Sequence, residues 1–415
     1  MPLTDWLRRL ETFSLHEIEL GLDRVHAVLE RMALLRPARV IHVGGTNGKG
    51  SSVAMLRALL SAGGTSVGTY MSPHVFEYNE RICIDGNVAG DEQIVVAFER
   101  VEAARDGIAL TYFEYGTLAA LAVFDALNVH TVILEVGMGG RLDAVNAVDP
   151  DAALITNVSL DHCDWLGDDV ESIAFEKAGI MRHDVPVVFA DRAVPGTIAQ
   201  QADEIGAILI AAGRDYDWTI NTNGEWAWRG QRHEFDSLAP PALIGAVQIQ
   251  NAAGALALLE ALGLDSLMEA KVIDMALGRL ALPGRMQVLA GKPECLFDVA
   301  HNPAAAAALA ESLAAADTTG LVAIIGMLDD KDVEGVVARL AGIVDHWIAV
   351  SAASPRALDA AELARRIANQ VDKACLIADS HDAAIEHARD FARDGGSILV
   401  TGSFYVVGPM LEMLS

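Results

Sequence analysis

Residues 39–51 read RVIHVGGTNGKGS, and this stretch decides the fold. It starts with an apolar, β-branched run typical of a buried strand, and a helical pattern follows at residues 50–62. A glycine-rich loop between a strand and a helix presents backbone N–H groups and the positive end of the helix dipole to an anion. Lys49 adds a cation that can reach phosphate oxygens, and the hydroxyl of Ser51 can reach Mg²⁺. The stretch therefore predicts a nucleotide-binding loop.

Outward from this loop, apolar runs alternate with helical patterns along most of the chain. Up to residue 190 the predicted strands are 39–43, 66–70, 131–136, 152–156 and 185–189, and the predicted helices are 50–62, 91–105, 116–127 and 169–180. Strands that are apolar throughout and separated by helices indicate a parallel sheet flanked by helices on both faces. Residues 215–236, with three tryptophans around Asn223-Gly224, instead predict a small antiparallel hairpin that covers a sheet edge.

A bend at residues 282–285 (LPGR) separates two predicted domains. Beyond the bend, strands at 295–299, 321–326, 346–350, 375–378 and 397–401 alternate with helices at 303–315, 332–341, 359–369 and 381–393. We therefore predict an α/β protein. An N-terminal P-loop, ATP-binding domain with a mainly parallel sheet spans residues 1–283, and a smaller, Rossmann-like α/β domain spans residues 284–415.

Charge and composition narrow the classes of partner. The 415 residues carry a formal net charge of −27, so nucleic acid and anionic membrane surfaces would be repelled. Neither an apolar run long enough to cross a membrane nor a signal-peptide core is apparent. The four cysteines are scattered, without zinc spacing, which is typical of reduced thiols in the cytoplasm. We expect a cytoplasmic protein with small-molecule partners only.

Polar residues follow three predicted strands of the first domain. Ser72, Glu135 and His162 each stand at or just beyond the carboxyl end of a strand. Those ends meet at one edge of a parallel sheet, where α/β proteins bind their ligands. A hydroxyl, a carboxylate and an imidazole gathered beside a phosphate loop predict a Mg²⁺ site. Lys177 differs, because its helical pattern alone predicts an ordinary solvated lysine.

Short motifs along nearly the whole chain closely resemble those of the Mur-ligase superfamily. Within it they are similar to the bifunctional dihydrofolate synthase/folylpolyglutamate synthase family, in the same order. The motifs are GTNGKGS (45–51), SPH (72–74), TYFEYGT (111–117), LEVGMGGRLD (134–143), DH (161–162), EKAGI (176–180), LPGR (282–285), FDVAHNP (297–303), GMLDDKD (326–332) and GSF (402–404). Val145 and Cys163 depart from this resemblance, since the family usually has Thr at both positions.

The resemblance implies a ligase that joins L-glutamate to dihydropteroate and to reduced folates, through an acyl phosphate made with ATP. The implied ATP-binding residues are Thr46, Asn47, Gly48, Lys49, Gly50, Ser51, Asn251, Arg285 and Asp298. The implied ligands of two Mg²⁺ ions are Ser72, Glu135, His162 and Lys177, the last as a carbamate that supplies anionic oxygen. The implied substrate contacts are Thr111, Tyr112, Phe113, Glu114, Leu142, Asp143, Ala144 and Ser403, and the implied catalytic residues are Lys49, Lys177 and His301.

The implied chemistry has a clear electrostatic demand. An anionic carboxylate must approach an anionic γ-phosphate, so we expect Lys49, the loop N–H groups and Mg²⁺ to neutralise the repulsion. His301 would then orient or deprotonate the amine of glutamate.

Two alternatives stay open at this point. One is a Mur-type ligase acting on a cell-wall precursor, although the phosphate loop begins so early that no additional N-terminal domain is expected. The other is a non-catalytic nucleotide switch, although no guanine-reading motif is present. For the ligase we expect a monomer.

Overall fold

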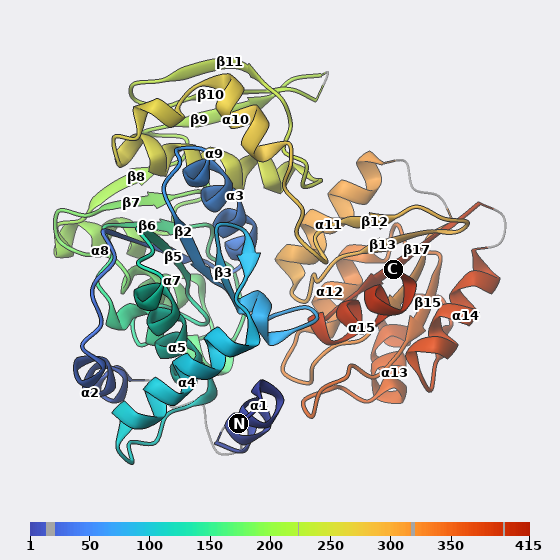
Figure 1. Cartoon of the computed structure of the whole chain (residues 1–415). Helices are drawn as coiled ribbons and strands as arrows, with labels where there is room; N and C mark the ends of the chain where they lie inside the picture. Colours follow the sequence, from blue (N-terminus) through green and yellow to red (C-terminus); the bar gives the residue numbers. More distant parts are fainter. Residues whose placement is uncertain (14–20, 223, 317–319, 393–394) are drawn as a thin grey trace. The chain divides into compact units, whose positions relative to one another are not determined.

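The computed structural model describes residues 1–13, 21–222, 224–316, 320–392 and 395–415 (Figure 1). The chain divides into two compact units. The first comprises Met1–Ser159, Cys163–Pro241 and Ile249–Leu280, and the second comprises Leu160–His162, Ala242–Gln248 and Ala281–Ser415. Two short segments that precede the bend thus group with the second unit.

The first unit is built on an eight-stranded sheet with the order β4-β3-β2-β5-β1-β6-β7-β8. The strands are β1 (Arg39–Gly44), β2 (Val67–Tyr70), β3 (Ile82–Ile84), β4 (Asn87–Val88), β5 (Thr131–Glu135), β6 (Ala152–Ile155), β7 (Pro186–Phe189) and β8 (Ile208–Ala211). All pair in parallel except β3 and β4, which add an antiparallel edge. The mainly parallel sheet predicted from the sequence is confirmed.

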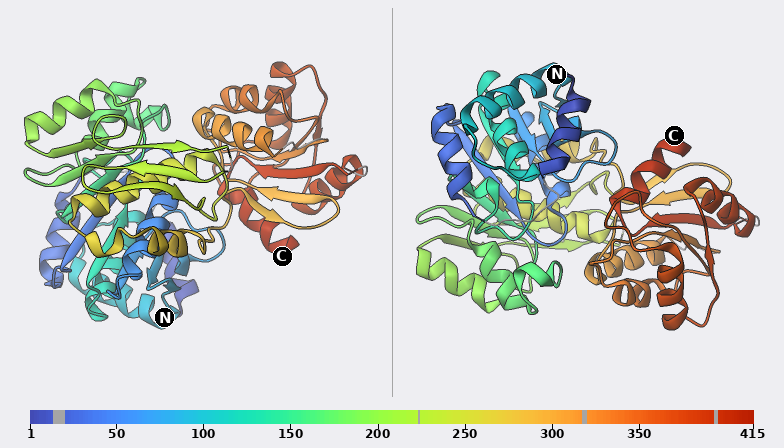
Figure 2. Two further views of the ribbon diagram at one scale, coloured as in Figure 1. Left: turned by 90° about the horizontal axis from the view of Figure 1, so that it is seen from above. Right: turned by 90° about the horizontal axis from the view of Figure 1, so that it is seen from below.

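Helices cover both faces of this sheet (Figure 2). They are α1 (Leu3–Phe13), α2 (Asp23–Met32), α3 (Lys49–Ser61), α4 (Asp91–Arg105), α5 (Tyr112–Ala126), α6 (Cys163–Leu166), α7 (Val170–Ala178), α8 (Gly196–Ile205), α9 (Ala246–Ala261) and α10 (Ala270–Leu277). Val40 and Ile41 are neighbours in β1 and point to opposite faces, yet both are fully buried. Burial on both faces explains why the strands read as continuous apolar runs.

The tryptophan-rich region forms a separate sheet with the order β11-β10-β9. Its antiparallel strands are β9 (Asp217–Ile220), β10 (Trp226–Arg229) and β11 (Glu234–Leu238). The predicted hairpin was therefore incomplete, and its turn residue Asn223 lies outside the described residues. The indole N–H of Trp228 donates to the carbonyl of Ala253 on α9 at 3.2 Å, so this sheet packs on that helix.

The second unit has a six-stranded sheet with the order β12-β13-β17-β14-β15-β16. Its strands are β12 (Gln287–Leu289), β13 (Glu294–Phe297), β14 (Val322–Ile325), β15 (His346–Ala349), β16 (Cys375–Ile377) and β17 (Ser397–Thr401). Its helices are α11 (Pro303–Ala315), α12 (Val333–Leu340), α13 (Ala360–Gln370), α14 (His381–Phe391) and α15 (Phe404–Leu414). Only β12 is antiparallel to its neighbour, which confirms the smaller α/β domain.

Two expectations from composition can be compared with the structure. Across the ranges given above, no helix combines the length and apolar character needed to cross a bilayer. All four cysteines are free thiols.

Candidate active site

The predicted nucleotide loop joins β1 to α3 and is held by the loop that follows β6. The N–H groups of Thr46 and Asn47 donate to the backbone and side-chain oxygens of Asn157, both at 3.0 Å. The hydroxyl of Thr156 donates to the carbonyl of Asn47 at 2.6 Å. These two backbone N–H groups are therefore used within the protein. The donors left for a phosphate are those of the first turn of α3, which have no acceptor inside the helix.

Lys49, Gly50 and Ser51 form that first turn. The Lys49 ammonium lies 3.1 Å from the carbonyl oxygens of Gly45 and Thr46, so it folds over the loop. The hydroxyl of the next residue, Ser52, is buried and has no hydrogen-bond partner within the described part of the chain. Unfilled hydrogen-bonding capacity beside a lysine and helix N–H groups fits a phosphate with its metal ion.

Gly48 precedes the helix in the left-handed conformation, with φ of +84°. A Cβ placed on Gly48 would lie only 2.7 Å from Oδ1 of Asn251 on α9. Asn251 is completely buried. Both predicted nucleotide contacts thus meet at one point, and only glycine fits there without strain.

The predicted metal residues Ser72 and Glu135 are neighbours. The Ser72 N–H donates to Oε2 of Glu135 at 3.0 Å. Ser72 follows β2, Glu135 ends β5, and these strands pair in parallel. Hard oxygen donors at adjoining strand ends fit a magnesium ion.

Lys177 lies on α7 and is only 4% exposed. The expectation of a solvated lysine, drawn from the helical pattern, is therefore wrong. The loop after Glu135 packs on the end of this helix, because Arg141 N–H donates to the Glu176 carbonyl at 2.8 Å. A Cβ on Gly140 would lie 2.9 Å from that same carbonyl. Small residues in the loop thus let α7 approach the strand end that carries Glu135.

The predicted substrate stretch begins helix α5. Thr111 is its N-cap and forms a capping box with Glu114, whose buried carboxylate also pairs with Arg24 at 2.8 Å. The ring of Phe113 would lie 2.7 Å from a Cβ on Gly137, two residues beyond Glu135. Phe113 therefore lies against the strand end that carries the predicted metal carboxylate.

Asp143 is 5% exposed and caps the short helix at residues 144–147. Its carboxylate accepts N–H groups from Met138 at 2.9 Å and Val145 at 3.0 Å. Burial raises the pKa of Asp143 to about 6, although these hydrogen bonds and the charge of Lys49 act in the opposite direction. The two residues that flank Asp143 were also predicted to contact the substrate: Leu142 is half-buried and Ala144 is buried.

In the second unit, three predicted residues surround Phe404. The Arg285 guanidinium carbon lies 5.0 Å from the ring centroid of Phe404, and the His301 ring lies 6.5 Å from it. Ser403 is buried and caps α15 by accepting the N–H of Tyr405 at 3.2 Å. The arrangement brings a guanidinium, an imidazole and a hydroxyl together.

Asp298 follows β13 in the same unit. It accepts the N–H groups of Met286 and Ala300, both at 2.9 Å. Burial raises the pKa of Asp298, against the opposing charge of Arg285. Asp298 is therefore anchored to the segment that carries Arg285.

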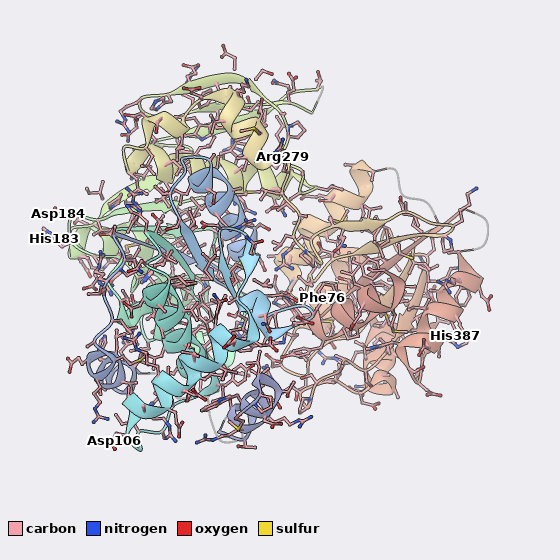
Figure 3. The ribbon with its side chains drawn as sticks, viewed as in Figure 1. Phe76, Asp106, His183, Asp184, Arg279 and His387 are labelled. Carbon is pink, nitrogen blue, oxygen red and sulfur yellow. The ribbon has the colours of Figure 1, made fainter. Side chains whose placement is uncertain are left out.

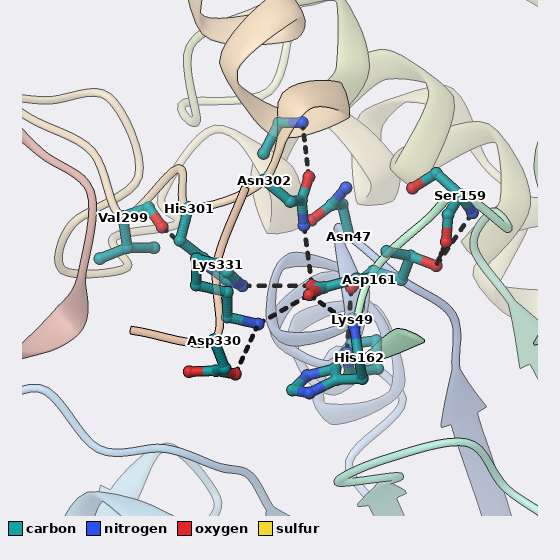
Figure 4. Close-up of polar contacts among 12 residues, drawn as sticks. Asn47, Lys49, Ser159, Asp161, His162, Val299, His301, Asn302, Asp330 and Lys331 are labelled. Atoms are coloured by element: carbon teal, nitrogen blue, oxygen red, sulfur yellow. Dashed lines mark hydrogen bonds and ion pairs between the residues drawn. The ribbon is translucent and has the colours of Figure 1, made fainter. Parts of the chain in front are cut away.

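Figure 4 shows a second polar cluster, centred on Asp161. Its carboxylate accepts from Lys331 at 2.6 Å and from Asn302 at 3.0 Å, and His301 Nε2 lies 3.5 Å away. Burial would raise the pKa of Asp161, but the hydrogen bond from His301 and the charge of Lys331 hold it well below its usual range. Lys331 and Asn302 lie within the GMLDDKD and FDVAHNP motifs, but the sequence alone predicts no role for either residue. The one sequence feature that could have indicated a role for Lys331 is its position between aspartates in GMLDDKD.

His162 follows Asp161 in the segment that groups with the second unit. Its φ is +54°, which is uncommon for a residue with a side chain. The described residues contain no cluster of three or more His, Cys, Asp or Glu side chains suited to a metal. The predicted set has only Glu135 and His162 of these types, so its role as a metal site stays a prediction.

Comparisons with known proteins identify the family. Residues 43–259 match the Mur ligase middle domain, and residues 284–404 match the Mur ligase glutamate ligase domain. The chain is 41% identical to the dihydrofolate synthase/folylpolyglutamate synthase of Escherichia coli K12, over 100% of this chain and 96% of that protein. It is 32% identical to the Mycobacterium tuberculosis protein of the same name, over 94% of this chain and 89% of that one.

Solved structures agree with the sequence comparison. The structure of E. coli FolC in complex with DHPP and ADP matches with a TM-score of 0.94 and 39% identity, covering 100% of this chain and 98% of that one. The Yersinia pestis enzyme with AMPPNP and Mn matches with a TM-score of 0.92 and 39% identity, over the same shares. These matches favour the folate ligase over the cell-wall ligase and the nucleotide switch. The chain therefore belongs to the dihydrofolate synthase/folylpolyglutamate synthase family of the Mur ligase superfamily, whose members are ligases that form C–N bonds.

Proposed function

We propose that this chain ligates L-glutamate to dihydropteroate, and then to reduced folates, at the expense of ATP. The observation that carries the proposal is the contact between the Ser72 N–H and the Glu135 carboxylate, with Phe113 lying against the same strand end. Two of the proposed metal ligands and one residue of the proposed substrate stretch thus lie at the end of β5, in the sheet whose central strand, β1, leads into the phosphate loop. The relatives' names and a neighbour solved with Mn, AMPPNP and L-glutamate support the same reading.

The first step would join a substrate carboxylate to the γ-phosphate of ATP. Lys49 and the first-turn N–H groups of α3 would hold the phosphates, with Asn251, Arg285 and Asp298 as the other predicted nucleotide contacts. Mg²⁺ would offset the negative charge that builds up as the two anions meet. We propose Ser72, Glu135, His162 and Lys177 as its ligands, for two ions.

The burial of Lys177 supports its proposed carbamylation. A charged lysine that is 4% exposed carries a large desolvation cost, and its ammonium group could not act as a metal ligand. A carbamate converts it into an anionic oxygen donor. ¹³C-bicarbonate labelling followed by NMR tests this: a carbamate carbon signal that disappears in Lys177→Ala is expected, and its absence from the wild type would refute carbamylation.

The second step would be attack by the amine of glutamate on the acyl phosphate. His301 and Ser403 are the proposed glutamate-handling residues, supported by their proximity to Phe404 and Arg285. Asp161, with Lys331 and Asn302, would fix the orientation of the His301 ring. We further propose that the enzyme acts in the cytoplasm as a monomer.

The test is a product assay with ATP, dihydropteroate and glutamate, each omitted in turn. We expect sustained ADP release, over many turnovers, only when all three are present, and a mass increase of the pteroate by one glutamyl residue. Reduced folates should gain further residues, and a metal chelator should stop both reactions. Sustained ADP release without dihydropteroate and glutamate would indicate a nucleotide switch, and rejection of dihydropteroate and folates would refute the proposal.

A further inference from the structure

Arg81 is a buried cation on the loop that follows Ser72. It ends the short helix Tyr78–Arg81 and is only 9% exposed. Its Nε donates to Nδ1 of His74 at 2.9 Å, two residues beyond Ser72. Removing a guanidinium from water is costly, so a buried arginine is expected to have a structural or functional role that compensates for this cost.

The guanidinium also contacts the predicted substrate stretch. Its carbon lies 5.3 Å from the ring centroid of Tyr112 and 5.4 Å from that of Tyr78. These two rings meet edge to face, with centroids 6.1 Å apart. Arg81 therefore connects the loop carrying a proposed metal ligand to a residue proposed to contact the substrate.

Two buried hydroxyls lie beside this cluster. Those of Tyr70 and Tyr78 have no hydrogen-bond partner among the described residues. Each oxygen would lie 2.9 Å from a Cβ on Gly116, so a glycine inside α5 leaves them room. A buried hydroxyl without a hydrogen-bond partner is destabilising, so a polar partner from water or a ligand is expected here.

The backbone of this loop is held independently of Arg81. The Glu80 carboxylate accepts the N–H groups of Val75, Phe76 and Glu77, each at 2.8 Å. The Phe76 side chain meanwhile remains exposed (Figure 3). Replacing Arg81 should therefore change the local charge without releasing the loop.

We propose that Arg81 is a positioning residue that selects the ionised carboxyl group of the aromatic acid substrate and draws it toward the Ser72 loop. The proposal rests on the function proposed above. An incoming carboxylate meets the negative charges of Glu135 and Asp143 in this unit. A guanidinium held in a low-dielectric setting opposes that repulsion over several ångströms, whereas a solvated one would be screened.

The test compares binding of dihydropteroate with binding of its methyl ester, which lacks the charge. Both are titrated in the presence of ADP, so that no turnover occurs. We expect the wild type to favour the acid by about tenfold or more, and Arg81→Met to bind both with similar affinity. Arg81→Lys should keep much of the preference. Arg8→Met is the matched control, because it removes the same charge from a side chain that is 78% exposed.

A purely structural role would weaken the acid and the ester equally. The proposal is overturned if the wild type shows no preference for the acid, or if Arg81→Met retains it. If Arg81→Met does not fold, Arg81→Gln replaces it, and its ratio of acid to ester affinity is compared with that of the wild type in the same way. Failure of the proposed function is distinguishable, since the wild type would then form no amide in the product assay.

Discussion

Replacing Gly48 with alanine tests how the nucleotide loop is built. Gly48 has a positive φ, and its missing side chain makes room for Asn251. The control is Gly64→Ala, since Gly64 has a similar φ of +75° but nothing within 4 Å of its added Cβ. The pair separates backbone strain from the contact with Asn251.

The magnitudes follow from these contacts. The left-handed conformation costs an L-residue roughly 1–2 kcal/mol, and both variants should lose this much stability. Gly48→Ala must also displace the amide of Asn251, whose Oδ1 and Nδ2 lie 2.7 and 3.1 Å from the new Cβ. Loss of one neutral hydrogen bond to the nucleotide is worth about 0.5–1.5 kcal/mol, or roughly two- to tenfold in affinity.

The assay is ADP titration calorimetry together with thermal unfolding of both variants. Gly64→Ala should bind ADP like the wild type despite its lower melting temperature. Gly48→Ala should be less stable than Gly64→Ala and bind ADP more weakly. Equal ADP affinities for the two variants would refute the proposed contact between Asn251 and the nucleotide.

Three further predictions concern the nucleotide loop, the second unit and the sheet. Lys49→Ala should abolish ligation, because the main cation over the loop is lost; ADP release is the measurement, and normal turnover would contradict the scheme. His301→Ala should leave ATP affinity unchanged while amide formation slows, so a weaker Kd for ATP would show that His301 serves the nucleotide instead. His42 is fully buried in β1, where burial first and the charge of Arg182 second lower its pKa to about 3. The unfolded chain takes up a proton near pH 6.5 that the folded chain refuses, so stability falls as the pH drops below 6.5, by about 2 kcal/mol at pH 5. Urea unfolding at pH 7.5 and pH 5 should show this loss in the wild type and not in His42→Leu; equal acid sensitivity would mean that His42 is not the cause.

Much of the fold could be predicted from the sequence because burial leaves a clear pattern. The central strands β1, β5 and β6 are covered on both faces, so they read as apolar runs bounded by turns. The edge strand β8 was not predicted although its sequence, ILIA, is apolar throughout, because so short an apolar run cannot be assigned to a strand or a helix by periodicity alone. The third strand of the tryptophan-rich sheet was missed for another reason: β11 is mostly exposed, and its sequence, EFDSL, is largely polar.

The candidate site was predictable only in part. Strand order places Ser72 and Glu135 together, and their contact follows from parallel pairing. The burial of Lys177 depends on how a glycine-rich loop packs on α7, which helical periodicity does not encode. Arg81 was missed because an arginine beside a glutamate reads as an ordinary charged surface pair. Its environment arises from Tyr78 and Tyr112, the latter more than thirty positions away in the sequence.

The hydrogen bonds that tie Thr46 and Asn47 to Asn157 have a kinetic consequence. A loop that is already hydrogen-bonded to the neighbouring loop loses little backbone conformational entropy when a nucleotide binds. Association should then proceed in one phase, at a rate proportional to ATP concentration, without saturation by a slow ordering step. The nucleotide loop would therefore keep the same backbone conformation before and after ATP binds.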